Sequence, residues 1–510
     1  MILSVILANF SQYYFQRSLE TLYKYQNQEL LYPSCSTILL TCFATTITGL
    51  IACYLPSREA LKLSIKHSLA KENSEHLFNN QVVKYLYLGI GLFCLALVPI
   101  VLKLKDLWLF IPPSLIILSL IFVLPSIIRL LPASSWDLTT AYVFDHFSSN
   151  LKRQSATISA ISISVAMLIG IGTMIFSFRV TVDKWINQVI NADLYLTMSK
   201  DFMTQDQAYF PSNFLDELLQ TPEIQSIDYA TFVDLEYNQQ PVTLIGTPFE
   251  NLKNKYVFKE RIVDQPDSLG AFVSESFLRK HKLKVNDEIS FSFQSSIAKF
   301  QILGSYIDYK SEFGTVTIDF KRFTNLTKQQ EPNVVSIFLR DSSKDSNKVN
   351  QLVKELSKSK INFLITDNQK IKQEILEIFD STFSLTYNIL LISLIISILN
   401  LMTNLKLLLI DQSRNFASLK AIGANSKYIS KIISFESMLI ISLSLFLGVT
   451  LGLLLAYYLV FIVNPNYFGW SIEFKTSLKL IILIITIPLI LAYAIRFLKF
   501  KTDSNLLKIK

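Results

Sequence analysis

The chain has 510 residues, of which 51% are hydrophobic and only 17% are charged, and its mean hydropathy is +0.37. This composition excludes an ordinary water-soluble globular protein. The formal net charge is +8, but the lysine and arginine residues lie beside apolar segments instead of forming one patch interleaved with aromatic residues. That placement favours membrane topology and predicts no nucleic-acid partner.

Apolar segments long enough to cross about 30 Å of hydrocarbon predict about seven transmembrane helices in a lipid bilayer. Their approximate ranges are 35–55, 85–102, 107–131, 156–178, 385–410, 434–463 and 475–497. The apolar stretch Met1–Phe10 is too short to cross, and it has neither a basic leader nor a small-residue cleavage site, so it does not look like a signal peptide.

The positive-inside rule orients these spans. Basic residues follow the first span, precede the fourth, lie between the fifth and the sixth, and follow the last. If the spans alternate, all four groups fall on one side of the membrane, which we expect to be cytoplasmic. Lys103 and Lys105 fall on the other side and are a mild exception. The sequence therefore predicts a multi-pass protein of the inner (cytoplasmic) membrane, with a cytoplasmic C-terminus and with residues 180–380 outside.

Residues 180–380 are soluble in composition and mix the periodicities of strands and helices. The predicted strands are Ala192–Met198, an alternating run over Ile227–Thr247, Asp287–Ser292, Ala298–Tyr309, Gly314–Phe320, Asn333–Arg340 and Asn362–Thr366. The predicted helices are Thr181–Ile190, Asn213–Gln220, a short one within Ala271–Lys282, Lys348–Ser359 and Asn368–Asp380. The predicted fold class is thus an α-helical polytopic membrane protein with one large α+β extracytoplasmic domain inserted between spans.

No pattern of catalytic residues is visible in the sequence. There is no GxxxxGK[ST] loop to cradle nucleotide phosphates, no HExxH motif and no paired CxxC. The four histidines are scattered, and we interpret each as a surface residue. The carboxylates of the outside domain show no catalytic spacing; they include Asp193, Asp234, Glu236 and Asp308. We therefore expect no enzymatic activity, no metal site and no cofactor held by this chain.

A polar and basic segment, Asp411–Ile433, separates the fifth and sixth predicted spans. Within it, Phe416, Leu419 and Ile422 recur at a three-residue spacing. That spacing predicts a short amphipathic helix over Arg414–Ala421 that lies along the membrane surface. The pattern alone fits both a plain amphipathic connector and a contact surface for a partner protein.

Glycine and other small residues mark two further features of this region. Gly423 stands where a helix is expected to end in a left-handed turn, and Asn425 or Ser426 is placed to cap the next helix. Two spans carry small residues at four-residue spacing, which lets another helix approach closely. These residues are Gly448, Gly452 and Ala456 in the sixth span and Ala156, Ala160 and Ser164 in the fourth. The spans have almost no charge at mid-depth, which disfavours ion-coupled transport.

The run Arg414–Ala424, RNFASLKAIGA, resembles the signature of FtsX-like permeases, the membrane subunits of MacB- and Lol-type ABC systems. That signature is an arginine, an acidic residue, and a small and hydrophobic run that ends in Leu-(Arg/Lys)-Ala-x-Gly-Ala. Asn415 stands here in place of the acidic residue. The other elements that resemble the family are Glu436 and Gly448 at similar spacings, Ile378–Phe383 before the fifth span, Phe468-Gly469-Trp470, and Pro56–Ser64 after the first span.

The resemblance implies the membrane permease subunit of an ABC transporter complex. A separate cytoplasmic ATPase dimer would bind the ATP, dock on a coupling segment at residues 411–433, and drive movements of the domain at 180–380 that export or extract a lipid, lipoprotein or other envelope substrate. The implied contact residues are Arg414, Asn415, Phe416, Ala417, Leu419, Lys420, Ala421 and Gly423. Two alternatives stay open: a non-transporting mechanotransmission scaffold that regulates an envelope enzyme, and a remnant of a split permease gene.

The family pattern also suggests a division of the chain. It gives an N-terminal remnant and outside loop at 1–34, the last span and cytoplasmic tail of a first permease unit at 35–84, a connecting helix pair and linker at 85–155, the first span of an FtsX-like unit at 156–179, the outside domain at 180–380, and a three-span permease core at 381–510. On this interpretation the chain is a two-unit member without its N-terminal portion. We expect a separately encoded first half, or a second copy of this chain, to supply a second coupling segment.

Overall fold

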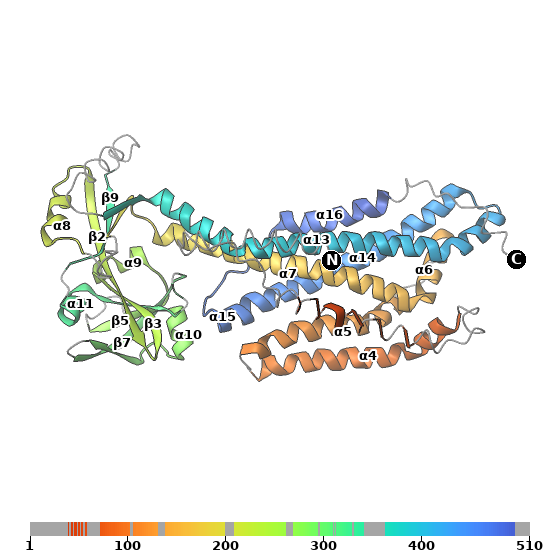
Figure 1. The fold of residues 1–510 in the computed structure, drawn as a ribbon, viewed down its shortest axis with the longest axis horizontal. Helices are drawn as coiled ribbons and strands as arrows, with labels where there is room; N and C mark the ends of the chain where they lie inside the picture. The colour runs from red at the N-terminus through yellow and green to blue at the C-terminus, as the bar shows by residue number, and fades with distance from the viewer. Residues whose placement is uncertain are drawn as a thin grey trace. The chain divides into compact units, whose positions relative to one another are not determined.

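The computed structural model describes residues 72–102, 106–130, 138–198, 209–261, 269–293, 296–309, 311, 313–328, 331–340 and 363–494, with a few helical positions between 39 and 58. The chain divides into two compact units (Figure 1). The helix bundle comprises Met1–Met174, Ser381–Tyr458 and Thr476–Lys510. The α+β domain comprises Ile175–Asp380 and Leu459–Lys475.

Within residues 72–494 of the described chain, seven α-helices contribute to the helix bundle. They are α4 (Glu72–Val101), α5 (Ile111–Arg129), α6 (Leu138–Ser149), α7 (Leu151–Val189), α13 (Asn368–Ala421), α14 (Ser426–Tyr458) and α16 (Leu478–Ala494), with a short 3-10 turn, η1, at Asp106–Phe110. The division between the two units falls inside α7 and α13 and at the end of α14. These two long helices therefore belong in part to each unit.

The polytopic helical architecture is confirmed for the described residues. Four helices there are long and apolar enough to cross a membrane: Gln81–Val101, Trp108–Arg129, Leu151–Val189 and Lys427–Tyr467. A bent pair, Asn368–Ser381 and Thr386–Ile395, is a fifth if it counts as one span, and Leu478–Ile490 is apolar but shorter. The predicted total of seven stays a prediction, because most of 35–55 lies outside the described residues.

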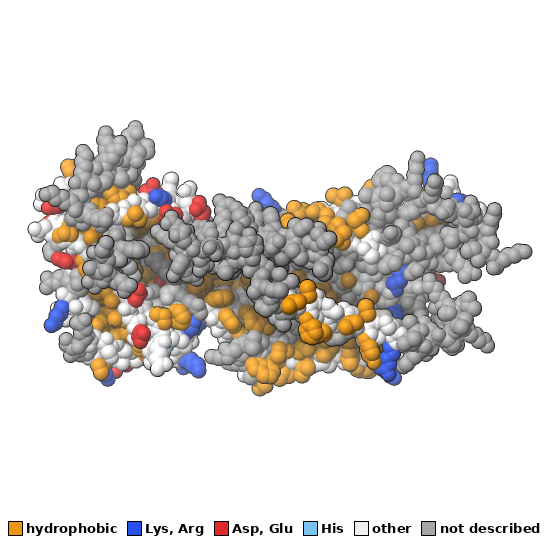
Figure 2. All heavy atoms as spheres, in the orientation of Figure 1, with side chains coloured by type: hydrophobic (Ala, Val, Ile, Leu, Met, Phe, Trp, Pro, Cys, Tyr) orange, Lys and Arg blue, Asp and Glu red, His pale blue; other side chains and the backbone are white. Residues whose placement is uncertain are grey.

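The core of the helix bundle forms where α7 and α14 pack their apolar faces together. It includes Ile158, Val165 and Ile169 from α7 with Ile433 and Ile441 from α14, all buried. In contrast, α4 and α5 pack on each other but leave large apolar side chains exposed, and Figure 2 shows hydrophobic side chains gathered over these two helices. Such exposure is what a helix surface presents to lipid.

Two helices run further than the sequence pattern predicts. The short surface helix predicted over Arg414–Ala421 is wrong as a separate element, because α13 is one 54-residue helix that ends at Ala421. Likewise the fourth predicted span and the helix predicted at Thr181–Ile190 are parts of the single 39-residue helix α7. Neither segment contains a glycine or proline at the predicted break, so the helix hydrogen bonds continue.

The α+β domain is built on a ten-stranded sheet in the order β10-β1-β9-β2-β3-β8-β5-β7-β4, with β6 paired to β7. The strands are β1 (Leu194–Met198), β2 (Ile224–Tyr237), β3 (Gln240–Thr247), β4 (Val257–Arg261), β5 (Gly270–Ser274), β6 (Glu288–Phe293), β7 (Ser296–Ile307), β8 (Thr315–Asp319), β9 (Val334–Leu339) and β10 (Phe363–Asp367). Its helical elements are α8 (Ser212–Leu219), η2 (Phe249–Asn251), α9 (Leu252–Lys255), α10 (Glu275–His281), α11 (Phe320–Thr327), the π turn η4 (Leu459–Val463) and α15 (Asn464–Tyr467). The predicted helix at Lys348–Ser359 lies outside the described residues.

One long strand joins two halves of this sheet. The first part of β2 pairs with β9 and the second part with β3, all antiparallel. Each half has its own apolar core: α8 covers one around Phe210 and Phe214, and α10 and α11 contribute Phe277 and Phe323 to the other. The predicted strands are thus confirmed, and among the described residues the sequence pattern missed the separate strands β4 and β5.

Candidate functional site

The turn between α13 and α14 has the geometry of a Schellman helix end. The Gly423 N–H donates to the Lys420 carbonyl at 3.1 Å, and the Ala424 N–H donates to the Leu419 carbonyl at 3.0 Å. Gly423 has φ +101°, a conformation that favours glycine. Asn425 then caps α14, because its Oδ1 accepts from the Lys427 N–H at 3.3 Å. The predicted left-handed stop and cap are confirmed.

One large apolar side chain at this turn, that of Ile422, is exposed. Ile422 is 82% exposed, and Lys420, Ala421 and Gly423 are also exposed. Leu419 is different: it is partly buried against the apolar core of the helix bundle. Its side chain therefore packs within this chain. The side chains of Arg414, Asn415, Phe416 and Ala417 lie outside the described part of the structure.

The glycines of the sixth predicted span lie at the closest approach of α14 to α7. A Cβ on Gly448 would be 2.7 Å from Val165 Cβ, and one on Gly452 would be 2.8 Å from Ile169 Cβ. The carbonyls of Ser162 and Ala166 are nearly as close, and Ser162 Oγ donates to the Ser444 carbonyl at 3.0 Å. Ala456 is fully buried. The face of α7 in this contact is Ser162, Val165, Ala166 and Ile169, not the stripe Ala156, Ala160 and Ser164.

A buried carboxylate lies between the same two helices. Glu436 of α14 is 1% exposed, and its Oε1 accepts a hydrogen bond of 3.0 Å from Gln154 Nε2 of α7. Gln154 is also 1% exposed. The pair therefore fixes α7 and α14 in register in a part of the bundle that water does not reach.

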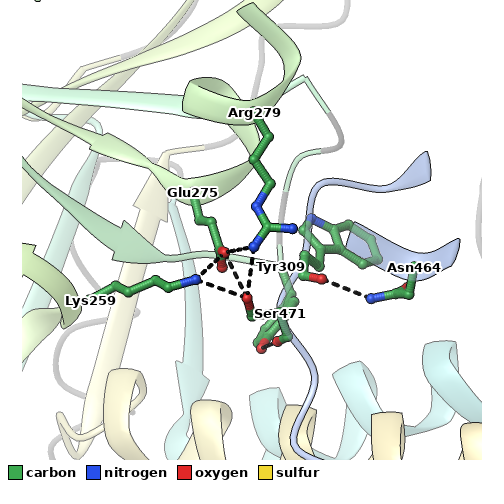
Figure 3. Close-up of polar contacts among 7 residues, drawn as sticks. Lys259, Glu275, Arg279, Tyr309, Asn464 and Ser471 are labelled. Atoms are coloured by element: carbon green, nitrogen blue, oxygen red, sulfur yellow. Dashed lines mark hydrogen bonds and ion pairs between the residues drawn. The ribbon is translucent and has the colours of Figure 1, made fainter. Parts of the chain in front are cut away.

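A group of polar contacts in the α+β domain surrounds Glu275 at the start of α10 (Figure 3). Its Oε1 lies 2.5 Å from both Lys259 Nζ of β4 and Arg279 Nη2 of α10. The same oxygen accepts a hydrogen bond of 2.6 Å from Ser471 Oγ. We call Glu275, Lys259, Arg279 and Ser471 the Glu275 cluster. The other carboxylate oxygen, Oε2, is buried without a hydrogen-bond partner among the described residues.

The Glu275 cluster keeps its carboxylate ionised. Burial alone would raise the pKa of Glu275, but the hydrogen bonds from Lys259 and Ser471 and the charges of Arg279 and Lys259 outweigh it and hold the pKa below its usual range. Burial, with the charges of Glu275 and Glu473, raises the pKa of the neighbouring Tyr309 well above its ordinary value. Tyr309 therefore stays neutral and donates to the Ser471 carbonyl at 2.6 Å.

Ser471 belongs to a loop, residues 468–475, that follows α15 and precedes α16. Other positions of this loop contact α7: the Glu473 N–H donates to Thr181 Oγ1 at 3.0 Å, and the Lys475 N–H donates to Ser177 Oγ at 3.0 Å. The Trp470 ring packs with Phe178, Tyr309 and Phe468, at centroid distances of 5.6, 5.8 and 5.7 Å. The FGW element of the sequence is thus a packed part of the α+β domain.

A cavity of about 490 Å³ lies beside this loop. It is lined by Thr181, Asp183, Lys184, Trp185, Asn187, Gln188, Val257, Ile307, Tyr309, Ser471, Ile472 and Glu473. The lining mixes an ion pair, Lys184 with Glu473, with amide, aromatic and aliphatic groups. No single ligand chemistry is selected by this set. Within the described residues, no group of three or more His, Cys, Asp or Glu side chains could hold a metal ion.

Sequence reasoning did not find the Glu275 cluster. The only local signal is the i, i+4 pair of Glu275 and Arg279, which many surface helices share. Three of the four carboxylates named in the sequence analysis have structural partners: Asp193 Oδ2 accepts from the Leu339 N–H, Asp234 Oδ1 from Thr243 Oγ1, and Asp308 Oδ2 from Thr315 Oγ1.

The fold and these contacts define an integral membrane protein in which a helix bundle and an α+β domain share two long helices. Residues 388–502 match the family described as FtsX-like permease C-terminal. This part of the chain is therefore an FtsX-like permease region, and the resemblance seen in the sequence is confirmed. The match includes the Schellman turn at Gly423 and the loop 468–475.

The chain is also similar to known proteins over longer stretches. It is 21% identical over 336 residues to an uncharacterized ABC transporter permease protein of Mycobacterium tuberculosis. The matched stretch covers 64% of this chain and 39% of that protein. The match thus spans about two fifths of that relative's length.

Two solved structures share a weaker likeness. The periplasmic region of MacB from Actinobacillus actinomycetemcomitans is 15% identical with a TM-score of 0.29, and covers 37% of this chain and 95% of its own. The extracellular domain of the noncanonic ABC-type transporter YknZ from Gram-positive bacteria is 10% identical with a TM-score of 0.25, and covers 34% of this chain and 99% of its own. Both TM-scores are low, and the similarity to FtsX-like permeases is carried by the match over residues 388–502.

Proposed function

We propose that this chain is the membrane permease subunit of an ABC transporter complex in the cytoplasmic membrane. A separate cytoplasmic ATPase dimer binds and hydrolyses ATP, and the permease converts its closure into movement of an extracytoplasmic α+β domain that acts on a lipid, lipoprotein or other envelope substrate. A second copy of this chain, or a separately encoded permease half, supplies the other ATPase contact. The C-terminus is cytoplasmic in this proposal.

The observation that carries the proposal is the exposed turn at the end of α13. Ile422 is 82% exposed on a turn fixed by two Schellman hydrogen bonds. An apolar side chain on a rigid turn is suited to fill a pocket of a partner, because little conformational entropy is lost when it docks. The exposed Lys420 and Lys427 flank it and favour an acidic rim on the partner.

The long helix gives this turn a mechanical role. Because α13 continues without a break through residues 411–421, a push on its C-terminal end is carried along this part of the helix; the helix bends by 50° between Ser381 and Thr386. The contact residues Arg414 to Ala417 lie on the last turns of the same helix and belong to the proposed docking surface. Leu419 does not, because it packs into the helix bundle.

The test is the substitution Ile422→Asp in the full-length chain, co-expressed with an ABC ATPase from the same genome that co-purifies with the wild-type chain. We expect the variant to insert in the membrane as the wild type does, but to retain at least tenfold less ATPase on affinity purification, because a charge replaces the apolar anchor. The matched control is Leu219→Asp, which alters a 55% exposed leucine of α8 in the α+β domain. Wild-type recovery of the ATPase by Ile422→Asp, or equal loss in the control, would contradict the proposal.

A further inference from the structure

The loop 468–475 is held against the α+β domain along its length. Residues 469–475 form neither helix nor strand, yet Gly469, Ser471, Glu473 and Lys475 each meet the domain. A Cβ on Gly469, at φ +74°, would be 3.0 Å from Ser276 Cα. The remaining three residues take part in the hydrogen bonds to Glu275, Thr181 and Ser177. Between these positions, Trp470 packs against Phe178 and Tyr309, and Ile472 is buried, so the loop contacts the domain along its whole length.

The Glu275 cluster is the strongest of these fastenings. Ser471 receives hydrogen bonds on its Oγ from Lys259 Nζ at 3.0 Å and Arg279 Nη2 at 3.2 Å while it donates to Glu275. Its carbonyl accepts from Tyr309. Hydrogen bonds to charged groups are stronger than neutral ones, and Glu275 is only 5% exposed, so water competes little.

The chain on either side of the loop leads to the helix bundle. Through α15 and η4 the loop is continuous with α14, and after Lys475 the chain enters α16 at Leu478. A loop that is fixed to the domain and covalently joined to two bundle helices carries any displacement of the domain to both of them. Loops tied this tightly are unusual, since most connecting segments are mobile.

We propose that the loop 468–475 is a third force-bearing connection of the α+β domain, beside α7 and α13, and that Glu275 is the positioning residue that fastens it. The inference depends on the proposed function, because only a domain that moves with the ATPase cycle exerts force on the loop. Without the Glu275 cluster, the loop keeps its hydrogen bonds to Thr181, Ser177 and Tyr309 but loses its charged contacts with the domain.

The test compares Glu275→Gln and Ser471→Ala with the wild-type complex in lipid nanodiscs. The matched control is Glu288→Gln, which breaks an exposed ion pair between Glu288 and Lys299 in the same domain. Hydrogen–deuterium exchange of residues 468–477 is expected to become ~10-fold faster or more in both test variants and to stay unchanged in the control, with the sheet unchanged in all. Ser471→Ala leaves the buried carboxylate and its two cations in place, so it tests the fastening even if Glu275→Gln folds poorly.

Spin labels report whether the loop transmits movement. They are placed at Leu219→Cys of α8 and Leu454→Cys of α14, both more than half exposed, after the native cysteines are replaced by alanine. The wild-type distance is expected to change between nucleotide-free and vanadate-trapped complexes, and the test variants are expected to lose at least half of that change.

Three results would overturn the inference or its basis. Unchanged exchange of the loop in both test variants means that the Glu275 cluster does not fasten it. Faster exchange with a full change in label distance means that the loop bears no force, while the proposed function stands. A wild-type chain that binds no ATPase removes the proposed function, and the force-bearing role with it, whatever the loop does.

Discussion

Each of the two units buries a glutamate, and the side chains that contact the two glutamates differ. Glu436 in the helix bundle is 1% exposed and accepts a hydrogen bond from the amide of Gln154. Glu275 in the α+β domain is 5% exposed, and its Oε1 contacts the ammonium of Lys259, the guanidinium of Arg279 and the hydroxyl of Ser471. The first contact joins two packed helices, and the second joins a strand, a helix and a loop.

The difference reflects the solvent of each unit. Lys259 and Arg279 reach Glu275 with side chains that are 38% and 35% exposed, so their charges keep part of their hydration while they pair. In the described part of the helix bundle, α7 and α14 approach each other closely at Gly448 and Gly452. The domain depends on its sheet, its apolar cores and charge pairs.

The largest expected effect is that of Gly448→Leu on the helix bundle. A Cβ there already falls 2.7 Å from Val165 and 2.9 Å from the Ser162 carbonyl, so a leucine forces α7 and α14 apart. We expect a loss of about 3 kcal/mol in the free energy of unfolding, measured by thermal unfolding in detergent. Gly91→Leu is the control, because nothing lies within 4 Å of a Cβ on Gly91 of α4. Equal stability of the two variants would show that close approach does not hold the bundle.

A smaller effect is expected for Glu436→Leu. It leaves the buried amide of Gln154 without this acceptor, which costs about 2 kcal/mol in the free energy of unfolding. Glu436→Gln keeps an oxygen that accepts from Gln154 and should lose less. The measurement is chemical unfolding in detergent micelles. If both variants unfold at the wild-type denaturant concentration, the buried hydrogen bond contributes nothing to the bundle.

The smallest effect is a pH dependence confined to the α+β domain. The pKa of Glu275 is lower in the folded protein than in an unfolded chain. Its stabilising contribution is therefore complete above the ordinary glutamate pKa of about 4.3 and is lost as pH falls below it through the folded value. We expect the fluorescence of Trp470, with the other tryptophans replaced by phenylalanine, to be constant from pH 7 to 5 and to change below about pH 4 as the loop loosens. The same change in Glu275→Gln would assign the transition to another group.

Much of the fold could be predicted because its signals are local. Gly423 and Asn425 mark the helix end and cap that the structure contains, and strand alternation placed β2, β3 and β9. The helix boundaries failed where the pattern of polarity changed but the backbone did not: α13 passes through the polar residues after Ile410 without a break. The polarity of a residue indicates whether that part of a helix faces water or lipid. A helix ends where a glycine, a proline or a capping group interrupts its backbone hydrogen bonds.

The sequence by itself determined that this is a membrane protein with a large α+β insertion and an FtsX-like segment, because hydropathy, periodicity and a short motif are properties of neighbouring residues. Only the tertiary structure decided which face of α7 meets Gly448, that Leu419 packs inward while Ile422 is exposed, and that Glu275 meets Ser471. Glu275 and Ser471 are 196 residues apart in the chain. No local pattern links two such residues, because the contact exists only after the sheet has placed α10 beside the loop.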